Sequence, residues 1–297
     1  MSELVLPWLP EGRLVRVEGR GELFARIHRH TDPSAPVVLL LHGWTASSDL
    51  QFVTAYSDLA ARYTVVGIDH RGHGRGLRAP DPFTLEDAAD DAAALLDTLG
   101  LRPAIPVGYS MGGPIAMLLA QRRPELVTGL VVQATALNWR NTKRDRLLWR
   151  VLPIAGSWLR SKGYRRSLNR AVPRVIGASR DGHPVRPLIP WLVSEMSRND
   201  PFVMVEAGRA LSHYDAQPWA GSLGVPAASL ITTADHLVPP RQQRALATAL
   251  GAEVRELAAD HFAPLSHPHR YTELTIELIE DVRQRASNRA LSSSGVA

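Results

Sequence analysis

Residues 104–117 read Ala-Ile-Pro-Val-Gly-Tyr-Ser-Met-Gly-Gly-Pro-Ile-Ala-Met, and this stretch decides the fold. An apolar run is followed by a Gly-x-Ser-x-Gly turn and then by an alanine-rich segment with helical spacing. In a strand–turn–helix setting this pattern forms a nucleophile elbow, which exposes the serine hydroxyl at the end of the strand. Gly108 and Gly112 leave room for the chain to fold back sharply around a strained Ser110. The stretch therefore predicts a catalytic serine, whereas the alternative reading is an ordinary turn serine.

Apolar runs on both sides of this stretch predict strands that alternate with helices. The expected strands are 13–18, 22–28, 37–41, 63–68, 105–107, 126–135, 227–233 and 253–257. The expected helices are 47–62, 84–99, the segment after the elbow, 239–250 and 269–285. The first two strands are predicted to form an antiparallel hairpin, while the alternation that follows is typical of a parallel sheet. We expect an α/β fold, with a mostly parallel eight-stranded sheet and helices on both faces.

The alternation stops between residues 138 and 215, where the sequence is irregular, proline-broken and mostly helical in character. We expect this segment to be a helical cap inserted after the sixth strand, above the strand ends where open α/β sheets bind ligands. Residues 1–137 and 216–285 then form the two parts of one core. Residues 286–297 are rich in serine and alanine and are expected to be a flexible tail.

Composition excludes several classes of protein. The 297 residues include no cysteine, so disulfides, thiolate nucleophiles and cysteine metal sites are ruled out. No histidine and carboxylate set has the spacing of metal ligands, and no motif for a cofactor or for nucleic acid is present. No apolar stretch is long enough for a signal peptide or a membrane span. We therefore expect a cytoplasmic protein that uses no metal and no cofactor and binds no nucleic acid.

A catalytic serine needs a base, and the base needs a carboxylate to orient it. Asp235 follows one predicted strand and His261 follows the next, so both lie at the same edge of the sheet as Ser110. Segment 134–143 after the sixth strand contains no carboxylate, which favours Asp235 as the acid. Four other side chains could be considered as the base or the acid, but we expect them to point away from the site or to lie in solvent. They are His236, His267, His269 and Asp260.

A tetrahedral intermediate needs backbone N–H groups that hold its oxyanion. We predict that these groups belong to Met111, directly after Ser110, and to Trp44, in the turn that follows strand 37–41. His42 is expected to hold this turn through buried hydrogen bonds. The turn that includes Asp69, Arg71 and His73 invites a catalytic interpretation, but a structural role in tying loops together is the better one.

The chain resembles the α/β-hydrolase superfamily of serine hydrolases. The motifs that carry the resemblance are His42-Gly43, Asp69-His70-Arg71-Gly72-His73-Gly74, Gly108-Tyr109-Ser110-Met111-Gly112-Gly113, Asp235 with Val238-Pro239, and His261. They span roughly residues 13–285 and leave the cap outside any motif. One departure is Asp260, where members of the superfamily often have glycine before the histidine. Serine at the elbow argues against epoxide hydrolases and haloalkane dehalogenases, which use aspartate there.

We expect an esterase- or lipase-like serine hydrolase that cleaves carboxylic esters of apolar acyl groups through an acyl-enzyme. Gly43, Tyr109 and Trp139 are predicted to contact the substrate. The cap contributes further apolar side chains, which favour uncharged acyl chains of short to medium length. An acyltransferase, a carbon–carbon bond hydrolase and a non-catalytic ligand receptor remain alternatives on the same residues. Nothing in the sequence indicates the oligomeric state.

The cap is also strongly basic. Residues 138–180 carry twelve arginine and lysine side chains and one acid, interleaved with tryptophan and leucine. This composition is that of a surface that rests on anionic lipid, and a solvated basic face is the alternative. Peripheral contact between the cap and an anionic membrane, with a lipid-derived ester as substrate, is therefore a hypothesis.

Overall fold

The computed structural model describes residues 7–139 and 186–294. Its centre is an eight-stranded sheet in the order β1-β2-β4-β3-β5-β6-β7-β8. The strands are β1 (Glu11–Val17), β2 (Gly21–His28), β3 (Val37–Leu41), β4 (Thr64–Ile68), β5 (Ala104–Tyr109), β6 (Leu130–Gln133), β7 (Ala227–Thr232) and β8 (Glu253–Leu257). The first two strands form an antiparallel hairpin that joins β4 antiparallel, and every other pairing is parallel. The predicted sheet is confirmed.

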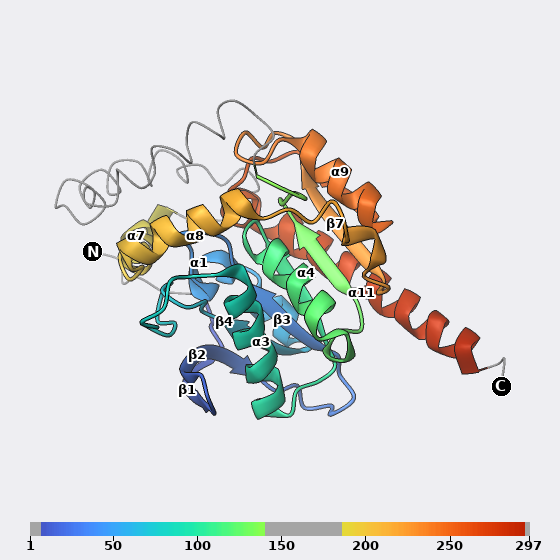
Figure 1. Cartoon of the computed structure of the whole chain (residues 1–297), viewed down its shortest axis with the longest axis horizontal. Helices are drawn as coiled ribbons and strands as arrows, with labels where there is room; N and C mark the ends of the chain where they lie inside the picture. Colours follow the sequence, from blue (N-terminus) through green and yellow to red (C-terminus); the bar gives the residue numbers. More distant parts are fainter. Residues whose placement is uncertain (1–6, 140–185, 295–297) are drawn as a thin grey trace.

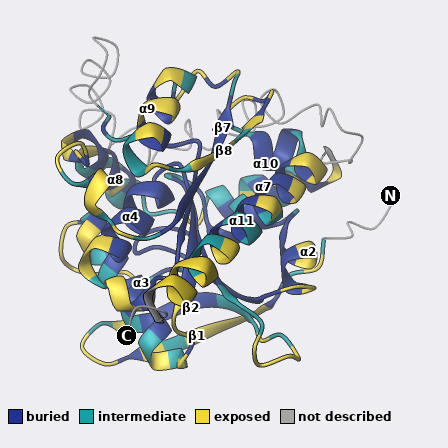
Figure 2. Cartoon of the chain, turned by 90° about the vertical axis from the view of Figure 1, so that its right-hand side faces the viewer, coloured by how far each residue is buried: buried dark blue, intermediate teal, exposed yellow. Residues whose placement is uncertain are grey.

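Helices cover both faces of the sheet (Figure 1). Their bounds are α1 (Ser48–Phe52), α2 (Tyr56–Ala60), α3 (Leu85–Leu99), α4 (Gly112–Arg122), α7 (Ile189–Met196), α8 (Pro201–His213), α9 (Pro240–Leu250), α10 (Ala263–Ser266) and α11 (Pro268–Ser294). Side chains of α3 and α4 form one apolar core with the sheet, and those of α1, α2 and α11 form another. The central strands β3 to β7 are buried between these helical layers, whereas the edge strands β1 and β8 are mostly exposed (Figure 2).

Two helix predictions are wrong. The helix expected over 47–62 is two short helices, α1 and α2, separated by residues 53–55. The last helix does not end at residue 285 but continues to Ser294, through most of the expected tail. Side chains explain the extension, because Arg285 donates to the Ala227 carbonyl and Arg289 donates to the Gly224 carbonyl. These contacts fasten the C-terminal part of α11 to the start of β7 and to the loop before it.

The chain leaves the sheet after β6 and returns to it at β7, which places the insertion after the sixth strand. Asn138 and Asp215 pair in an antiparallel bridge, and the Ala216 N–H donates to the Leu137 carbonyl at 2.9 Å. The two ends of the insertion therefore lie side by side. Helices α7 and α8 belong to it and lie over the end of the sheet where the parallel strands finish (Figure 1).

Residues 140–185 of the expected cap lie outside the described residues. This range includes Trp149, Trp158 and all twelve basic side chains of the proposed lipid-binding face. Trp191 and Leu192 of α7 are two of the apolar side chains that the cap was expected to bring near the site. They pack in one apolar cluster with Leu50 of α1 and Leu265 of α10, and this cluster attaches α7 to the core. Over 7–139 and 186–294, no helix is both long and apolar enough to cross a membrane.

Candidate active site

The nucleophile elbow has the predicted strain. Ser110 adopts φ 53°, a left-handed conformation that side-chain-bearing residues rarely take. The chain folds back so closely that a Cβ at Gly108 would lie 2.2 Å from the Gly112 carbonyl oxygen. A Cβ at Gly112 would lie 2.0 Å from the Leu41 carbonyl oxygen on the neighbouring strand. Both positions therefore require glycine, and they hold Ser110 at the end of β5, immediately before α4.

Ser110, His261 and Asp235 form one hydrogen-bonded chain. Nδ1 of His261 lies 2.7 Å from Oδ2 of Asp235, and Nε2 of His261 lies 3.0 Å from Oγ of Ser110. An ionised carboxylate can only accept, so the proton of the neutral imidazole resides on Nδ1. Nε2 is then the acceptor that faces the serine hydroxyl. The side chains come from three separate strand ends, and the structure brings them together as the sequence predicted.

Asp235 is held in its ionised form. Burial opposes the charge, but the hydrogen bond to His261 and the backbone N–H of Val238 outweigh burial and keep the pKa of this carboxyl below its ordinary value. The N–H groups of Leu237 and Val238 donate to Oδ1 at 2.8 and 2.9 Å, while Thr232 Oγ1 donates to Oδ2 at 2.9 Å. All these bonds fix the carboxylate so that one lone pair remains aimed at His261.

Sequence reasoning missed Gln243, which supports this acid from α9. Its Nε2 donates to the Val238 carbonyl at 2.7 Å and to Thr232 Oγ1 at 2.9 Å, while its Oε1 accepts from the Thr232 N–H at 3.0 Å. A signal was available in the sequence. Gln243 shares a helical face with Leu246 and Ala247, both buried, and an amide on such a face needs polar partners in the interior.

Tyr109 packs against His261 and holds its backbone. Its ring packs edge-on against those of His261 and Tyr271, and its hydroxyl donates to the His261 carbonyl at 2.9 Å. Tyr109 was predicted to contact substrate, and it does border the cavity at the serine. Its side chain is nevertheless almost fully buried, so its main contact is with the loop that carries His261.

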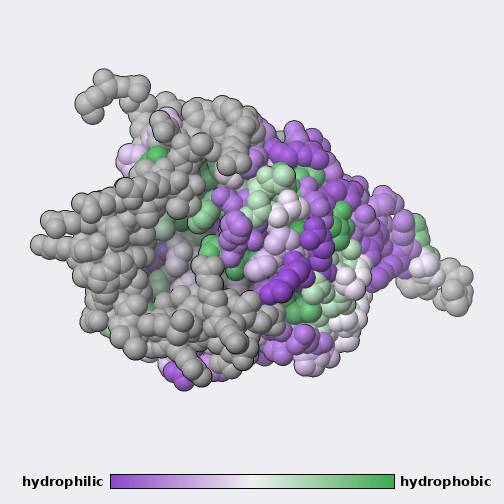
Figure 3. Space-filling model, turned by 90° about the horizontal axis from the view of Figure 1, so that it is seen from above, coloured by the Kyte–Doolittle hydropathy of each residue, from purple (hydrophilic) through white to green (hydrophobic). Residues whose placement is uncertain are grey.

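Two cavity lobes meet at Ser110 and His261. The larger lobe, of about 270 Å³, is bordered by Trp139, Leu211, Leu237, Val238 and Gln242. The smaller lobe, of about 100 Å³, is bordered by Gly43, Leu50, Gln51, Met196 and Leu265. Both are bordered by Trp44, Thr45 and Phe262. Figure 3 looks onto this end of the molecule and shows hydrophobic surface in the hollow at its centre. Gly43 and Trp139, two of the predicted contacts, therefore lie in the walls of the site.

The turn after β3 is anchored by the inserted segment. Trp44 Nε1 donates to the Met204 carbonyl of α8 at 2.8 Å. Asn199, just before α8, donates through Nδ2 to the Thr45 carbonyl at 2.6 Å and accepts from the Gly74 N–H at 2.8 Å. Thr45 needs such a partner, because its φ of 63° is a strained conformation. The insertion thus fixes the backbone that faces Ser110.

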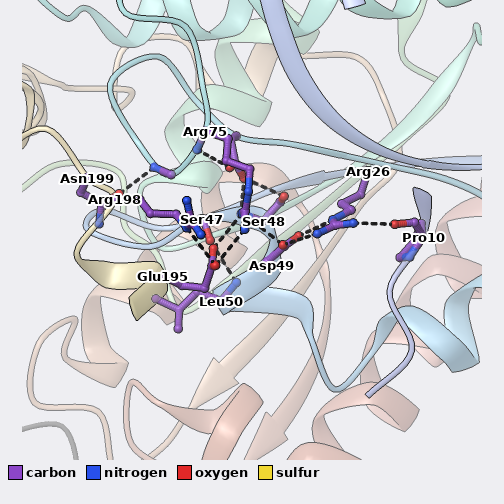
Figure 4. A network of polar contacts seen from close by, with 12 residues as sticks. Pro10, Arg26, Ser47, Ser48, Asp49, Leu50, Arg75, Glu195, Arg198 and Asn199 are labelled. Atoms are coloured by element: carbon purple, nitrogen blue, oxygen red, sulfur yellow. Dashed lines mark hydrogen bonds and ion pairs between the residues drawn. The ribbon is translucent and has the colours of Figure 1, made fainter. Parts of the chain in front are cut away.

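A buried network of charges fastens α7 beside the smaller lobe (Figure 4). Asp49 of α1 binds Arg26 at 2.7 Å and Arg75 at 3.3 Å, and Arg75 forms two 2.8 Å hydrogen bonds with the carboxylate of Glu195. The Asp49 and Glu195 side chains are at most 1% exposed. Removal of one partner from such a buried pair typically costs about 3–5 kcal/mol. The network therefore holds Met196, next in the chain, against the cavity.

His42 has the predicted structural role. It is fully buried, its Nε2 accepts from the His70 N–H at 3.0 Å, and its Nδ1 contacts the Gly43 carbonyl at 2.8 Å. The neighbouring loop residues are also structural, as expected. Asp69 accepts hydrogen bonds from the N–H and the hydroxyl of Ser48. The Arg71 guanidinium forms a bidentate ion pair with the Asp91 carboxylate.

Three buried imidazoles lie behind this turn. Ring centroids of His42 and His70 are 4.2 Å apart, and those of His42 and His73 are 5.3 Å apart. Burial lowers the pKa of His70 to about 3 and that of His73 to about 4, while burial and the two neighbouring rings lower the pKa of His42. Neither ring nitrogen of His70 has a hydrogen-bond partner among the described residues. In those residues, no group of three or more histidine and carboxylate side chains is arranged to hold a metal ion.

These imidazoles predict a loss of stability in acid. Below pH 6.5 these histidines bind protons in the unfolded chain but not in the folded one. The free energy of unfolding therefore decreases as the pH is lowered, until the pH reaches the pKa of the histidine in the folded protein. Each such histidine then costs about 2 kcal/mol at pH 5. We expect His70→Leu to raise the free energy of unfolding and to reduce its drop between pH 8 and pH 5 by about that amount. Urea unfolding at both pH values measures this, and an equal drop in both proteins would contradict it.

The comparisons with known proteins identify the family of the chain. Residues 36–268 match the family model of the alpha/beta hydrolase fold, and the chain belongs to that family. Among curated proteins, a pimeloyl-[acyl-carrier protein] methyl ester esterase of Neisseria meningitidis is 28% identical over 261 residues, covering 86% of this chain and 80% of that protein. Other curated relatives are likewise named as esterases and hydrolases.

Solved structures share the fold. The enol-lactonase of Burkholderia xenovorans superimposes with a TM-score of 0.77 at 24% identity, covering 90% of this chain and 100% of that one. A thermophilic esterase of Thermogutta terrifontis gives a TM-score of 0.75 at 22% identity, covering 92% and 99%. At this level of identity, the likeness concerns architecture alone.

Proposed function

We propose that the protein hydrolyses carboxylic esters through a Ser110–His261–Asp235 triad and an acyl-enzyme. The observation that carries this proposal is the chain of hydrogen bonds from Asp235 Oδ2 through the imidazole to Ser110 Oγ, of 2.7 and 3.0 Å. It opens onto an apolar cavity, which suits an organic substrate. The esterase names of several relatives point to the same bond type.

In the proposed reaction, His261 Nε2 takes the proton of Ser110 as its oxygen attacks the ester carbonyl. The N–H groups of Trp44 and Met111 donate to the resulting oxyanion, and Asp235 stabilises the imidazolium. The imidazolium then protonates the departing alcohol, which leaves an ester of Ser110. Water attacks this ester with His261 again as base, and the acid and free Ser110 are released. The start of α4 immediately after Ser110 adds a favourable field for the negative charge.

The cavity favours uncharged acyl chains of short to medium length. The walls of the larger lobe are apolar apart from a few polar groups, and no lysine or arginine of the described residues borders either lobe. A buried carboxylate without a cation beside it is costly. We therefore expect an apolar ester to be turned over faster than an analogue that carries a carboxylate.

A graded series of p-nitrophenyl esters tests the proposed function. From acetate to palmitate, kcat/KM is expected to peak at short to medium chains and to fall at the longest. A carboxylate-terminated ester of matched length serves as the comparison. Absence of turnover with the whole series would contradict ester hydrolysis, and faster turnover of the charged ester would contradict the substrate class.

Asn199 offers a test of the anchored turn. Asn199→Ala removes the hydrogen bond to the Thr45 carbonyl, and we expect kcat to fall by about 10- to 100-fold with little change in KM, because a small displacement of positioning groups slows the chemical step. Asn199→Asp is the matched variant, since it keeps an acceptor for the Gly74 N–H but loses the donor to Thr45. Full kcat in Asn199→Asp would show that the Thr45 contact is irrelevant to turnover.

A further inference from the structure

Gln242 lies at the wall of the larger lobe and has an unpartnered amide nitrogen. The residue is 8% exposed, and its Nε2 is buried without a hydrogen-bond partner among the described residues. The adjacent Gln243 differs, because its amide group is bonded to Thr232 and Val238 around the triad acid. A buried N–H group without an acceptor costs about 1–3 kcal/mol, and a ligand that supplies an acceptor recovers this free energy.

The first turn of α9 determines where this amide lies. The Gln242 N–H donates to the Pro239 carbonyl at 2.8 Å, which fixes the start of the helix directly after the loop that carries Asp235. Successive residues on a helix point in different directions. Gln243 therefore reaches Asp235, while Gln242 borders the lobe together with Leu237 and Val238.

We propose that Gln242 is a specificity-determining residue, whose amide turns into the larger lobe when an ester fills it, so that Nε2 donates to an uncharged oxygen acceptor of that ester. This inference rests on the proposed ester hydrolysis and narrows its substrate class to esters with a second carbonyl, or a comparable neutral acceptor, along the chain. An uncharged acceptor is buried in the lobe at a lower cost in free energy than a carboxylate. An apolar chain leaves the amide unpaired, and a site built to hydrogen-bond its substrate disfavours such an analogue.

The test moves a ketone along otherwise identical esters. One series is p-nitrophenyl octanoate and its 4-, 5-, 6- and 7-oxo derivatives. The other is octyl acetate with the ketone at the corresponding carbons of the alcohol, so that both sides of the ester are scanned. We expect one ketone position to raise kcat/KM about tenfold over the plain ester, which corresponds to about 1.4 kcal/mol.

Gln242→Met keeps the length of the side chain and removes the donor, so we expect the ratio of kcat/KM for the keto ester to kcat/KM for the plain ester to fall to about one. Arg241→Met is the matched control on the exposed side of the same turn, and it should keep the preference. Equal turnover of keto and plain esters at every position, or an undiminished preference in Gln242→Met, would overturn the proposal.

A binding measurement separates this inference from the proposed function. The same ester pairs are titrated by calorimetry against Ser110→Ala and against Ser110→Ala combined with Gln242→Met, in which turnover is removed. Tighter binding of one keto ester only when Gln242 is present supports the amide contact even if the native protein hydrolyses no ester. Loss of turnover with a preserved binding preference therefore contradicts the catalysis alone, and equal binding contradicts the role of Gln242.

Discussion

Ser110→Ala is expected to lower kcat for the best ester of the series by about 10⁶-fold, the loss typical of a triad nucleophile. The variant removes only the oxygen that faces His261 Nε2 at 3.0 Å. Its backbone strain is unchanged, because alanine at φ 53° is no more constrained than serine. We therefore expect the thermal midpoint of unfolding to stay close to that of the native protein.

The residual rate of this variant is itself informative. Donors for the oxyanion and the cavity remain, so a small acceleration over water is expected. His261→Ala should cause a loss of similar size, and the double variant should be no slower than either single one, because the two side chains act as a unit. Additive losses would contradict a shared proton transfer between Ser110 and His261.

Asp235→Asn is expected to lower kcat by about 10⁴-fold with little change in structure. The asparagine oxygen still accepts from the Leu237 and Val238 N–H groups. Its NH₂ group, however, faces His261 Nδ1, which then has to accept rather than donate. The imidazole proton moves to Nε2, and this nitrogen no longer takes the proton of Ser110.

Asp260→Asn is the matched control for this substitution. Asp260 is adjacent to His261 but is exposed and accepts from the Phe262 N–H at 2.9 Å, away from the imidazole. We expect its kcat to equal that of the native protein. A silent Asp235→Asn, or an equally damaging Asp260→Asn, would show that the assignment of the acid is wrong.

Local sequence determined the elbow and the sheet because their constraints are local. Only glycine tolerates the 2.2 and 2.0 Å approaches at residues 108 and 112, and buried parallel strands need continuous apolar runs. The partners of Ser110 were also predictable, since parallel strands place the residues that follow them at one edge of the sheet. His261 and Asp235 lie where this argument put them.

Features that depend on long-range contacts were predicted less well. The end of α11 is fixed by Arg285 and Arg289, whose acceptors lie more than 50 residues away in the chain. The break between α1 and α2 has no strong breaker in the sequence. The roles of Gln242 and Gln243 depend on which side of α9 meets the cavity and which meets Asp235, and this is set by the packing of the helix on the sheet.

The most direct test of the central claim is covalent labelling with a fluorophosphonate, followed by peptide mapping in a mass spectrometer. The account predicts one adduct per chain, located on Ser110, absent from Ser110→Ala and formed much more slowly in His261→Ala. Asp260→Asn should label at the native rate. An unlabelled native protein, or an adduct on a serine other than Ser110 that persists in Ser110→Ala, would contradict the assignment of Ser110 as an activated nucleophile.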